Sequence, residues 1–106
     1  MIKRIVKMSF KPEHVNDFKT IFENNWQKIK GFDGCSSVEL LQDVNEPGIF
    51  FTYSLWQSEE HLNRYRNSEL FNTVWGSTKI LLNAKPKAWS VKSVLMCSGI
   101  VVAFFL

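Results

Sequence analysis

Residues 49–56, IFFTYSLW, constrain the fold most strongly because they are typical of a β-strand with two apolar faces. Side chains alternate across a strand. The two faces would carry Ile49, Phe51, Tyr53 and Leu55 on one side and Phe50, Thr52, Ser54 and Trp56 on the other. Neither set suits contact with water, so we expect a layer of protein on each side of this strand.

The segment that follows this strand is helical. Ser58 with Glu59 and Glu60 forms a capped acidic turn that opens a first helical piece. Ser68 is the expected N-cap of a second piece, whose apolar residues fall on one stripe. The stripe consists of Phe71, Val74, Trp75, Thr78, Leu81 and Leu82. We expect this helix to face the strand.

The N-terminal third predicts a strand and then a long helix. On the first strand one face consists of Ile2, Val6, Met8 and Phe10, interrupted by Arg4, while Ile5 accompanies Lys3, Lys7 and Ser9 on the wetter face. Pro12 opens the helix and Gly31 closes it. Its apolar stripe consists of Val15, Phe18, Phe22, Trp26 and Ile29.

The remaining segments complete an α+β pattern. Residues 35–42 form a predicted hairpin with residues 49–56 through the turn at 45–48, and residues 88–94 follow Pro86 as a fourth strand. The order strand, helix, strand, strand, helix, strand is the ferredoxin-like split βαβ arrangement, a four-stranded antiparallel sheet with helices on one face. We assign residues 1–94 to one such domain and residues 95–106 to an apolar C-terminal tail.

Composition and net charge indicate which binding partners to expect. Aromatic residues make up 14% of 106 residues, more than one small core uses, and the sheet would leave one apolar face open. We therefore expect a homodimer in which two sheets pack face to face as an α+β barrel. The net charge of +3 is scattered along the chain, which argues against nucleic-acid binding.

The cysteines and the N-terminus bear on location. Cys35 and Cys97 form no disulfide framework, and the segment MIKRIVKMSF does not have the pattern of a secretory signal. We expect a cytoplasmic protein.

The uncharged tail, residues 94–106, is too short for a membrane-spanning helix. Its β-branched run, Ile100 to Val102, favours an extension of the fourth strand over a partner subunit. Three alternatives stay open: a weak membrane contact, a lid over the apolar patch, and an extension that binds nothing.

An aromatic cavity between helices and sheet is the predicted ligand site. Trp26, Tyr65 and Trp75 would line it, since each joins an apolar ring to one hydrogen-bonding group. The alternative is that all three are ordinary core residues. His14 and His61 are isolated in sequence, and no set of residues has the spacing of metal ligands, so we expect no metal site.

Several of these segments together resemble the antibiotic biosynthesis monooxygenase domain family. The resemblance covers residues 1 to about 94, and it rests on Trp56-Gln-Ser58 at the end of a strand, YRNSELF at 65–71 with Trp75, and GFDGC at 31–35. It implies a dimeric α+β barrel. Characterised members include monooxygenases without a cofactor that act on polycyclic phenols or quinols, haem-degrading enzymes and an isomerase.

The haem-degrading branch uses an asparagine, an aromatic residue and an iron-ligating histidine, at positions that align with Val6, Tyr65 and Trp75. Only the aromatic position matches, and the Trp75 ring has no lone pair for iron. The resemblance therefore favours a monooxygenase without a cofactor, with a small aromatic ligand near Val6, Tyr65 and Trp75. His61 is the nominal general base, although a readily ionised substrate or a bound water could replace it.

Two other functions stay open at this point. One is a noncatalytic ligand-binding or interaction module of the same fold, and the other is isomerase or decarboxylase chemistry.

Overall fold

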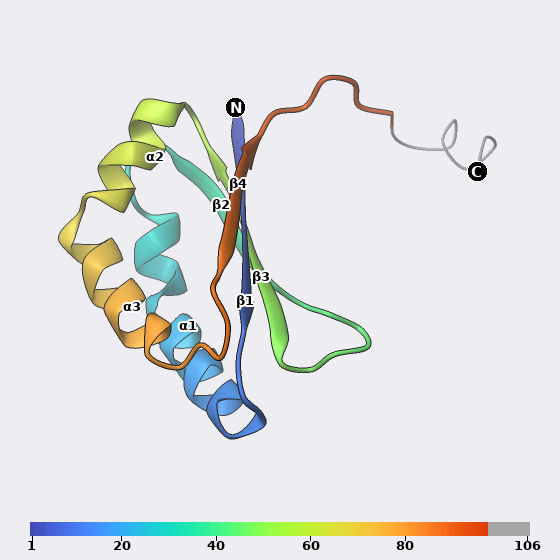
Figure 1. Cartoon of the computed structure of the whole chain (residues 1–106). Coiled ribbons are helices and arrows are strands. Elements are labelled where there is room, and N and C mark those ends of the chain that lie inside the picture. The colour runs from blue at the N-terminus through green and yellow to red at the C-terminus, as the bar shows by residue number, and fades with distance from the viewer. Residues whose placement is uncertain (98–106) are drawn as a thin grey trace.

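The computed structural model describes residues 1–97, which fold into one layer of helices on one sheet (Figure 1). The strands are β1 (Ile2–Ser9), β2 (Cys35–Gln42), β3 (Ile49–Trp56) and β4 (Lys87–Val91). The helices are a 3-10 turn η1 (Pro12–His14), α1 (Val15–Lys30), α2 (Glu59–Arg66) and α3 (Glu69–Lys79). The predicted α+β class and ferredoxin-like order of elements are confirmed.

The sheet has the strand order β2-β3-β1-β4, and every neighbouring pair is antiparallel. β3 pairs with β1 from Ile2 opposite Trp56 to Ser9 opposite Ile49. The strand with two apolar faces therefore lies inside the sheet, where its backbone is paired on both edges.

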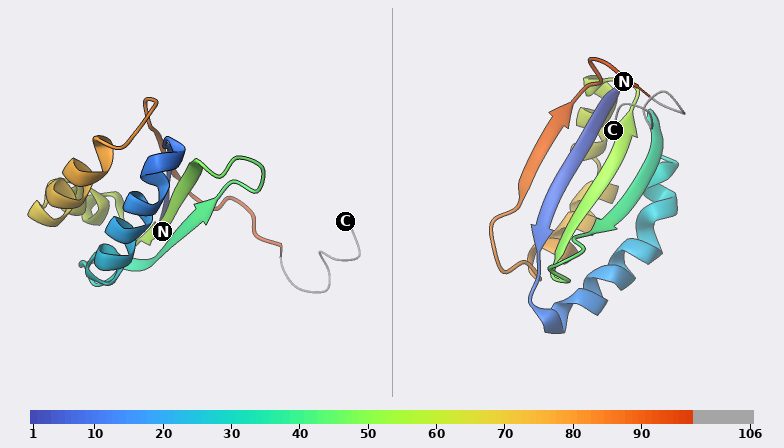
Figure 2. Two further views of the ribbon diagram at one scale, coloured as in Figure 1. Left: turned by 90° about the horizontal axis from the view of Figure 1, so that it is seen from below. Right: turned by 90° about the vertical axis from the view of Figure 1, so that its right-hand side faces the viewer.

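The helices cover only one face of the sheet, as both views in Figure 2 show. The register places Phe50, Thr52, Ser54 and Trp56 on the helix side, with Phe51, Tyr53 and Leu55 on the other. Figure 2, right, looks onto this open face. Its apolar residues lie on all four strands and consist of Ile5, Leu41, Phe51, Tyr53, Leu55, Trp89 and Val91. Leu41, Trp89 and Val91 are exposed.

A compact aromatic core anchors α1 to the sheet. Phe10 and Phe18 stack with ring centroids 4.3 Å apart, and Phe50 meets Phe18 edge to face at 5.3 Å. Met8 completes this buried group. Aromatic pairs of this kind add about 0.5–1.5 kcal/mol each to the stabilisation from burial.

Local signals set most helix ends. The Ser58 side chain accepts a hydrogen bond from the His61 backbone amide, and Ser68 accepts one from the amide of Phe71, as N-caps do. Each predicted cap is therefore confirmed. The 3-10 turn at Pro12 precedes α1, so the regular helix begins at Val15 and not at the proline.

The predicted C-terminal boundaries were too long. Leu81 and Leu82 lie beyond α3, which ends at Lys79, although both still pack on the core. β4 ends at Val91 instead of residue 94, and residues 92–97 belong to no strand, so the predicted strand extension is absent from residues 92–97. The rest of the predicted extension, residues 98–106, lies outside the described residues. No helix within residues 1–97 is long and apolar enough to cross a membrane.

Candidate functional site

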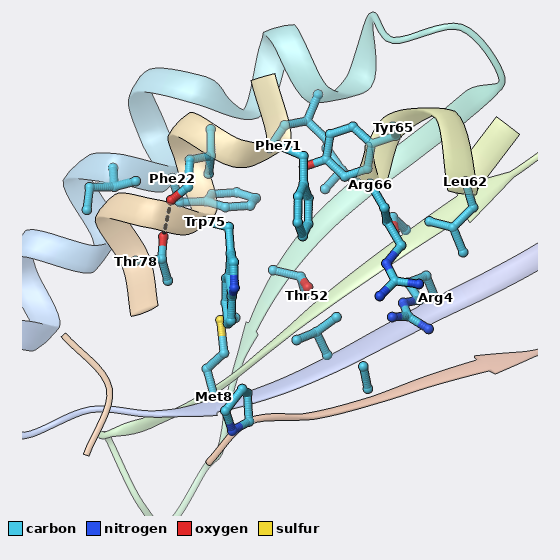
Figure 3. A pocket seen from close by; sticks show the side chains of 18 of the residues that line it. Arg4, Met8, Phe22, Thr52, Leu62, Tyr65, Arg66, Phe71, Trp75 and Thr78 are labelled. Atoms are coloured by element: carbon cyan, nitrogen blue, oxygen red, sulfur yellow. Dashed lines mark hydrogen bonds between the residues drawn. The ribbon is translucent and has the colours of Figure 1, made fainter. Parts of the chain in front are cut away.

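A cavity of about 300 Å³ lies between the helical layer and the covered face of the sheet (Figure 3). The sheet supplies its floor, which includes Arg4, Val6, Met8, Val38, Thr52, Ser54, Trp56 and Ala88. The helices supply its walls, which include Phe18, Ile21, Phe22, Leu62, Tyr65, Arg66, Phe71, Val74, Trp75 and Thr78. The volume lies at the small end of the range for ligand pockets, about 300–1,000 Å³.

Aromatic rings form a continuous series along this cavity. Trp56 and Tyr65 stack at 4.9 Å, Tyr65 meets Phe71 edge to face at 5.3 Å, and Phe71 and Trp75 are roughly parallel at 6.4 Å. The Trp56 ring is fully buried, and its Nε1–H donates a hydrogen bond to Ser54 Oγ at 2.9 Å. We call Trp56, Tyr65, Phe71 and Trp75 the aromatic wall. A flat ring of a ligand can stack on such a surface.

Tyr65 carries a hydroxyl into this wall. Burial, and to a smaller degree the nearby Cys35, raises the pKa of Tyr65 to about 12. The phenol is neutral near pH 7, so its hydroxyl can donate a hydrogen bond to a ligand and cannot act as a phenolate base. No side-chain hydrogen bond within residues 1–97 uses this hydroxyl, which leaves it available to a ligand or water.

The charged residues of the lining are Arg4, Arg66 and Lys87, and the described lining includes no carboxylate and no histidine. Arg4 lies on β1 and Arg66 is the last residue of α2, yet Figure 3 shows their guanidinium groups side by side. Burial, with a smaller contribution from Arg66, lowers the pKa of Arg4 below its usual value, although the group stays charged near neutral pH. Sequence reasoning assigned no role to these arginines. The signal available for Arg4 was its position on the otherwise apolar face of the first strand.

The structure brings three of the predicted site residues to the cavity. Val6 lies on the floor, and Tyr65 and Trp75 belong to the aromatic wall. Trp26 does not line the cavity; it lies on the outer side of α1 with 37% of its surface exposed. The predicted stripe placed Trp26 with the core because it lies four residues after Phe22. The cavity instead meets α1 through Phe18, Ile21, Phe22 and Ile29.

His61 also does not line the cavity. Its Nδ1 lies 2.7 Å from Ser58 Oγ, and its Nε2 lies 3.8 Å from the Asp33 carboxylate near the start of α2. The helix start opens toward the loop before β2 instead of toward the cavity, so we assign His61 no part in proton transfer. His14 lies elsewhere, with Nδ1 3.3 Å from the Leu81 carbonyl oxygen. Within residues 1–97, no three His, Cys, Asp or Glu side chains gather as metal ligands would.

The fold and the cavity together define a small α+β protein with an aromatic-lined cavity between its helices and its sheet. The sequence model of one family, described as antibiotic biosynthesis monooxygenase (ABM), matches residues 1–74. This match covers well over half of the chain, and the chain belongs to the ABM family. No curated protein matches the chain.

Several solved structures share the fold of this chain. A structure described as an antibiotic biosynthesis monooxygenase superposes with a TM-score of 0.83 at 19% identity, covering 90% of this chain and 100% of that chain. Rv0793 from Mycobacterium tuberculosis superposes with a TM-score of 0.82 at 15% identity, covering 92% of this chain and 98% of Rv0793. PA3566 from Pseudomonas aeruginosa superposes with a TM-score of 0.78 at 19% identity, covering 89% of this chain and 94% of PA3566. At these identities the likeness concerns the fold alone.

Proposed function

We propose that this protein is a monooxygenase without a cofactor that oxidises a small electron-rich aromatic compound, such as a phenol, quinol or anthrone-like ring. The observation that carries the proposal is the aromatic wall, in which four rings follow one another along a cavity of about 300 Å³. Membership of the ABM family supports the same reaction class. A cytoplasmic location is part of the proposal, since Cys35 and Cys97 are free thiols.

The proposed chemistry needs little from the protein. An ionised phenol or anthrone can pass one electron to dioxygen, and the two radicals can then combine at carbon. In the net reaction a ring CH₂ and O₂ give C=O and H₂O, so one oxygen atom is retained, the other leaves as water, and the substrate supplies all four electrons. No external reductant is required.

The cavity residues have separate tasks in this proposal. Trp75 and Phe71 hold the ring of the substrate, Val6 limits its depth, and the neutral Tyr65 hydroxyl donates a hydrogen bond to the substrate oxygen. Apolar walls keep water from the reactive intermediates. Because no carboxylate or histidine of residues 1–97 lines the cavity, a water at the mouth takes the proton of the substrate.

We also propose that the protein is a homodimer that packs its open sheet face against the same face of a second copy. This face carries apolar side chains on all four strands, including Trp89 with 43% of its surface exposed. Exposed apolar patches of this extent mark interfaces. Face-to-face sheets pack about 10 Å apart and bury both sets of side chains.

Oxygen uptake tests the reaction directly. Purified protein in chelator is offered anthrones, naphthols and hydroquinones, with heat-inactivated protein as the blank. We expect uptake that is proportional to the amount of active protein, with one O₂ consumed per oxidised ring. Uptake that equals the blank across the panel would contradict the proposal.

The second function supported by the cavity is noncatalytic binding of a small aromatic ligand. The same aromatic wall serves it, since stacking and exclusion of water also give affinity. It predicts saturable binding of a naphthol without oxygen uptake. Calorimetric titration of the panel beside the uptake assay distinguishes the two functions.

A further inference from the structure

The cavity has one cationic side, and the rest of its lining is uncharged. Arg4, Arg66 and Lys87 are the charged lining residues, and none of them has a carboxylate within salt-bridge distance among residues 1–97. The polar contact of Arg4 is instead with a neutral group, because its Nη1 donates to Ser90 Oγ at 3.0 Å. Lys87 pairs with Lys7 in the register that places Trp89 on the open face, so the cationic side of the cavity consists of Arg4 and Arg66. Two cations with no acidic partner leave a positive potential toward the cavity.

The two arginines come from different elements and still meet. Arg4 extends from the middle of β1 and is half-buried, while Arg66 ends α2 and is more exposed. Figure 3 shows both guanidinium groups on the same side of the cavity, with Trp75 on the opposite side and Thr52 between them. Like charges held side by side repel each other, and an anion between them removes that cost.

Arg64, which lies on α2 as Arg66 does, differs from Arg66 because it has acidic partners. Its Nη1 lies 3.4 Å from Asp33, and its Nη2 lies 3.9 Å from Glu60. Carboxylates are therefore present at the outer side of α2, where Arg64 uses them. Arg66, two residues later, points to the side of the helix that meets the cavity and has no such partner within residues 1–97.

We infer that the cavity binds aromatic compounds that carry a carboxylate, with the ring on the aromatic wall and the carboxylate between Arg4 and Arg66. Guanidinium groups offer paired N–H donors that match the two oxygens of a carboxylate. A volume of about 300 Å³ admits a substituted two-ring compound. The inference rests on the proposed function only for the later reaction with oxygen, since binding requires no turnover.

The test compares two ligands that differ in one charge. 1-Hydroxy-2-naphthoate and 1-hydroxy-2-naphthamide are titrated into the whole protein by calorimetry at pH 6, where a carboxylate is ionised and a phenol is neutral. We expect the wild-type protein to bind the acid at least about tenfold more tightly than the amide, as one charge-assisted hydrogen bond would produce. This preference should shrink as salt is added.

Three variants test whether Arg4 and Arg66 cause the preference for the acid over the amide. Arg4→Gln and Arg66→Gln should each weaken binding of the acid more than binding of the amide, so that the acid-to-amide affinity ratio falls about fivefold or more. Arg64→Gln is the matched control, because it removes the same charge from α2 outside the cavity, and its ratio should equal that of the wild type. Arg66 is exposed, so its replacement tests the inference even where Arg4→Gln disturbs the sheet.

Either of two results would overturn the inference: a ratio near one in the wild type, or Arg66→Gln and Arg64→Gln proteins with the same ratio. Oxygen uptake is measured separately on a neutral anthrone. Acid preference without uptake would remove the proposed monooxygenase and keep the inference. Oxygen uptake with the neutral anthrone, without tighter binding of the acid than of the amide, would keep the proposed monooxygenase and remove the inference.

Discussion

Tyr65 and Trp75 have different environments although both belong to the aromatic wall. Tyr65 lies between Trp56 and Phe71, with centroid distances of 4.9 and 5.3 Å, so its ring is fixed by its neighbours. Trp75 contacts Phe71 at 6.4 Å on one side and reaches toward Met8 across the cavity (Figure 3). Tyr65 therefore positions a hydroxyl, whereas Trp75 supplies surface for the ligand.

Trp75→Ala should lower kcat/KM for the best substrate of the uptake panel by at least about tenfold, because it removes the largest ligand-facing ring. Trp75 is half-buried, so the free energy of unfolding should fall by less than the about 3–5 kcal/mol of a fully buried aromatic residue. Trp26→Ala is the control, since Trp26 lies on the outer side of α1. Equal kcat/KM in the two variants would take Trp75 out of the site.

Tyr65→Phe should lower kcat about tenfold and change KM little. The phenyl ring keeps the stacking on Trp56, and only the hydrogen bond to the developing charge on the substrate oxygen is lost. Steady-state oxygen uptake measures both constants. A variant with unchanged kcat would show that the hydroxyl takes no part in turnover.

Tyr65 also predicts a pH dependence of stability. Its pKa is raised from 10 to about 12 by burial, so the folded state disfavours the phenolate. The stabilisation is complete below pH 10 and is lost as the pH rises from 10 through 12, by roughly 2–3 kcal/mol at most. Urea unfolding of the wild type and of Tyr65→Phe over this range measures the difference. If the free energy of unfolding changed with pH in the same way in both proteins, the raised pKa of Tyr65 would be contradicted.

At the scale of elements, the loop between α1 and β2 fixes where α2 begins. Gly34 has φ of 87°, a left-handed conformation, and an added Cβ would lie 2.3 Å from the His61 ring. The carbonyl of Gly34 also accepts a hydrogen bond from the Gln57 amide at the end of β3. The glycine therefore lets the start of α2 pack closely on this loop.

Gly34→Ala should destabilise the protein by roughly 2–4 kcal/mol through backbone strain and overpacking. Gly76→Ala is the matched control, because Gly76 lies within α3 with no atom within 4 Å of an added Cβ. Its replacement should stabilise the helix by up to about 1 kcal/mol. Thermal unfolding compares the variants, and a Gly34→Ala protein as stable as the wild type would refute the packing argument.

At the scale of the whole molecule, the one-sided helical layer leaves the sheet half covered (Figure 1). The covered face holds the cavity and the buried core, while the other face holds Tyr53 and Trp89 in reach of solvent. In the proposed homodimer, a second copy of the chain would present the same apolar surface across a two-fold axis.

Trp89→Glu should convert the dimer into a monomer, because a charge in a face-to-face sheet interface loses its hydration without a partner. Val44→Glu, at a turn position that is 95% exposed, should leave the dimer intact. Sedimentation velocity measures the mass of each variant. A monomeric wild-type protein, or a dimeric Trp89→Glu protein, would contradict the proposed interface.

The sequence predicted the order of elements because the signals for it are local. Alternation along residues 49–56, the caps Ser58 and Ser68, and the breaks at Gly31 and Pro86 each act within a few residues. Predicted ends were less accurate at Lys79 and Val91, where helix and strand stop without a strong local signal. Val6, Tyr65 and Trp75 line the cavity. Trp75 lies on a predicted apolar stripe, whereas Tyr65 lies outside the stripes and Val6 was indicated only by the family resemblance.

Tertiary structure alone decided which polar side chains share the cavity. Arg4 and Arg66 are 62 positions apart, and their meeting depends on how α2 lies over β1. The rotation of α1 decided that Trp26 faces outward, since a helical stripe wider than the contact leaves one edge exposed. The sequence by itself determined the fold and the aromatic character of the site, because apolar periodicity is a property of each element. The charge of the site required the packed structure, because it depends on contacts between elements.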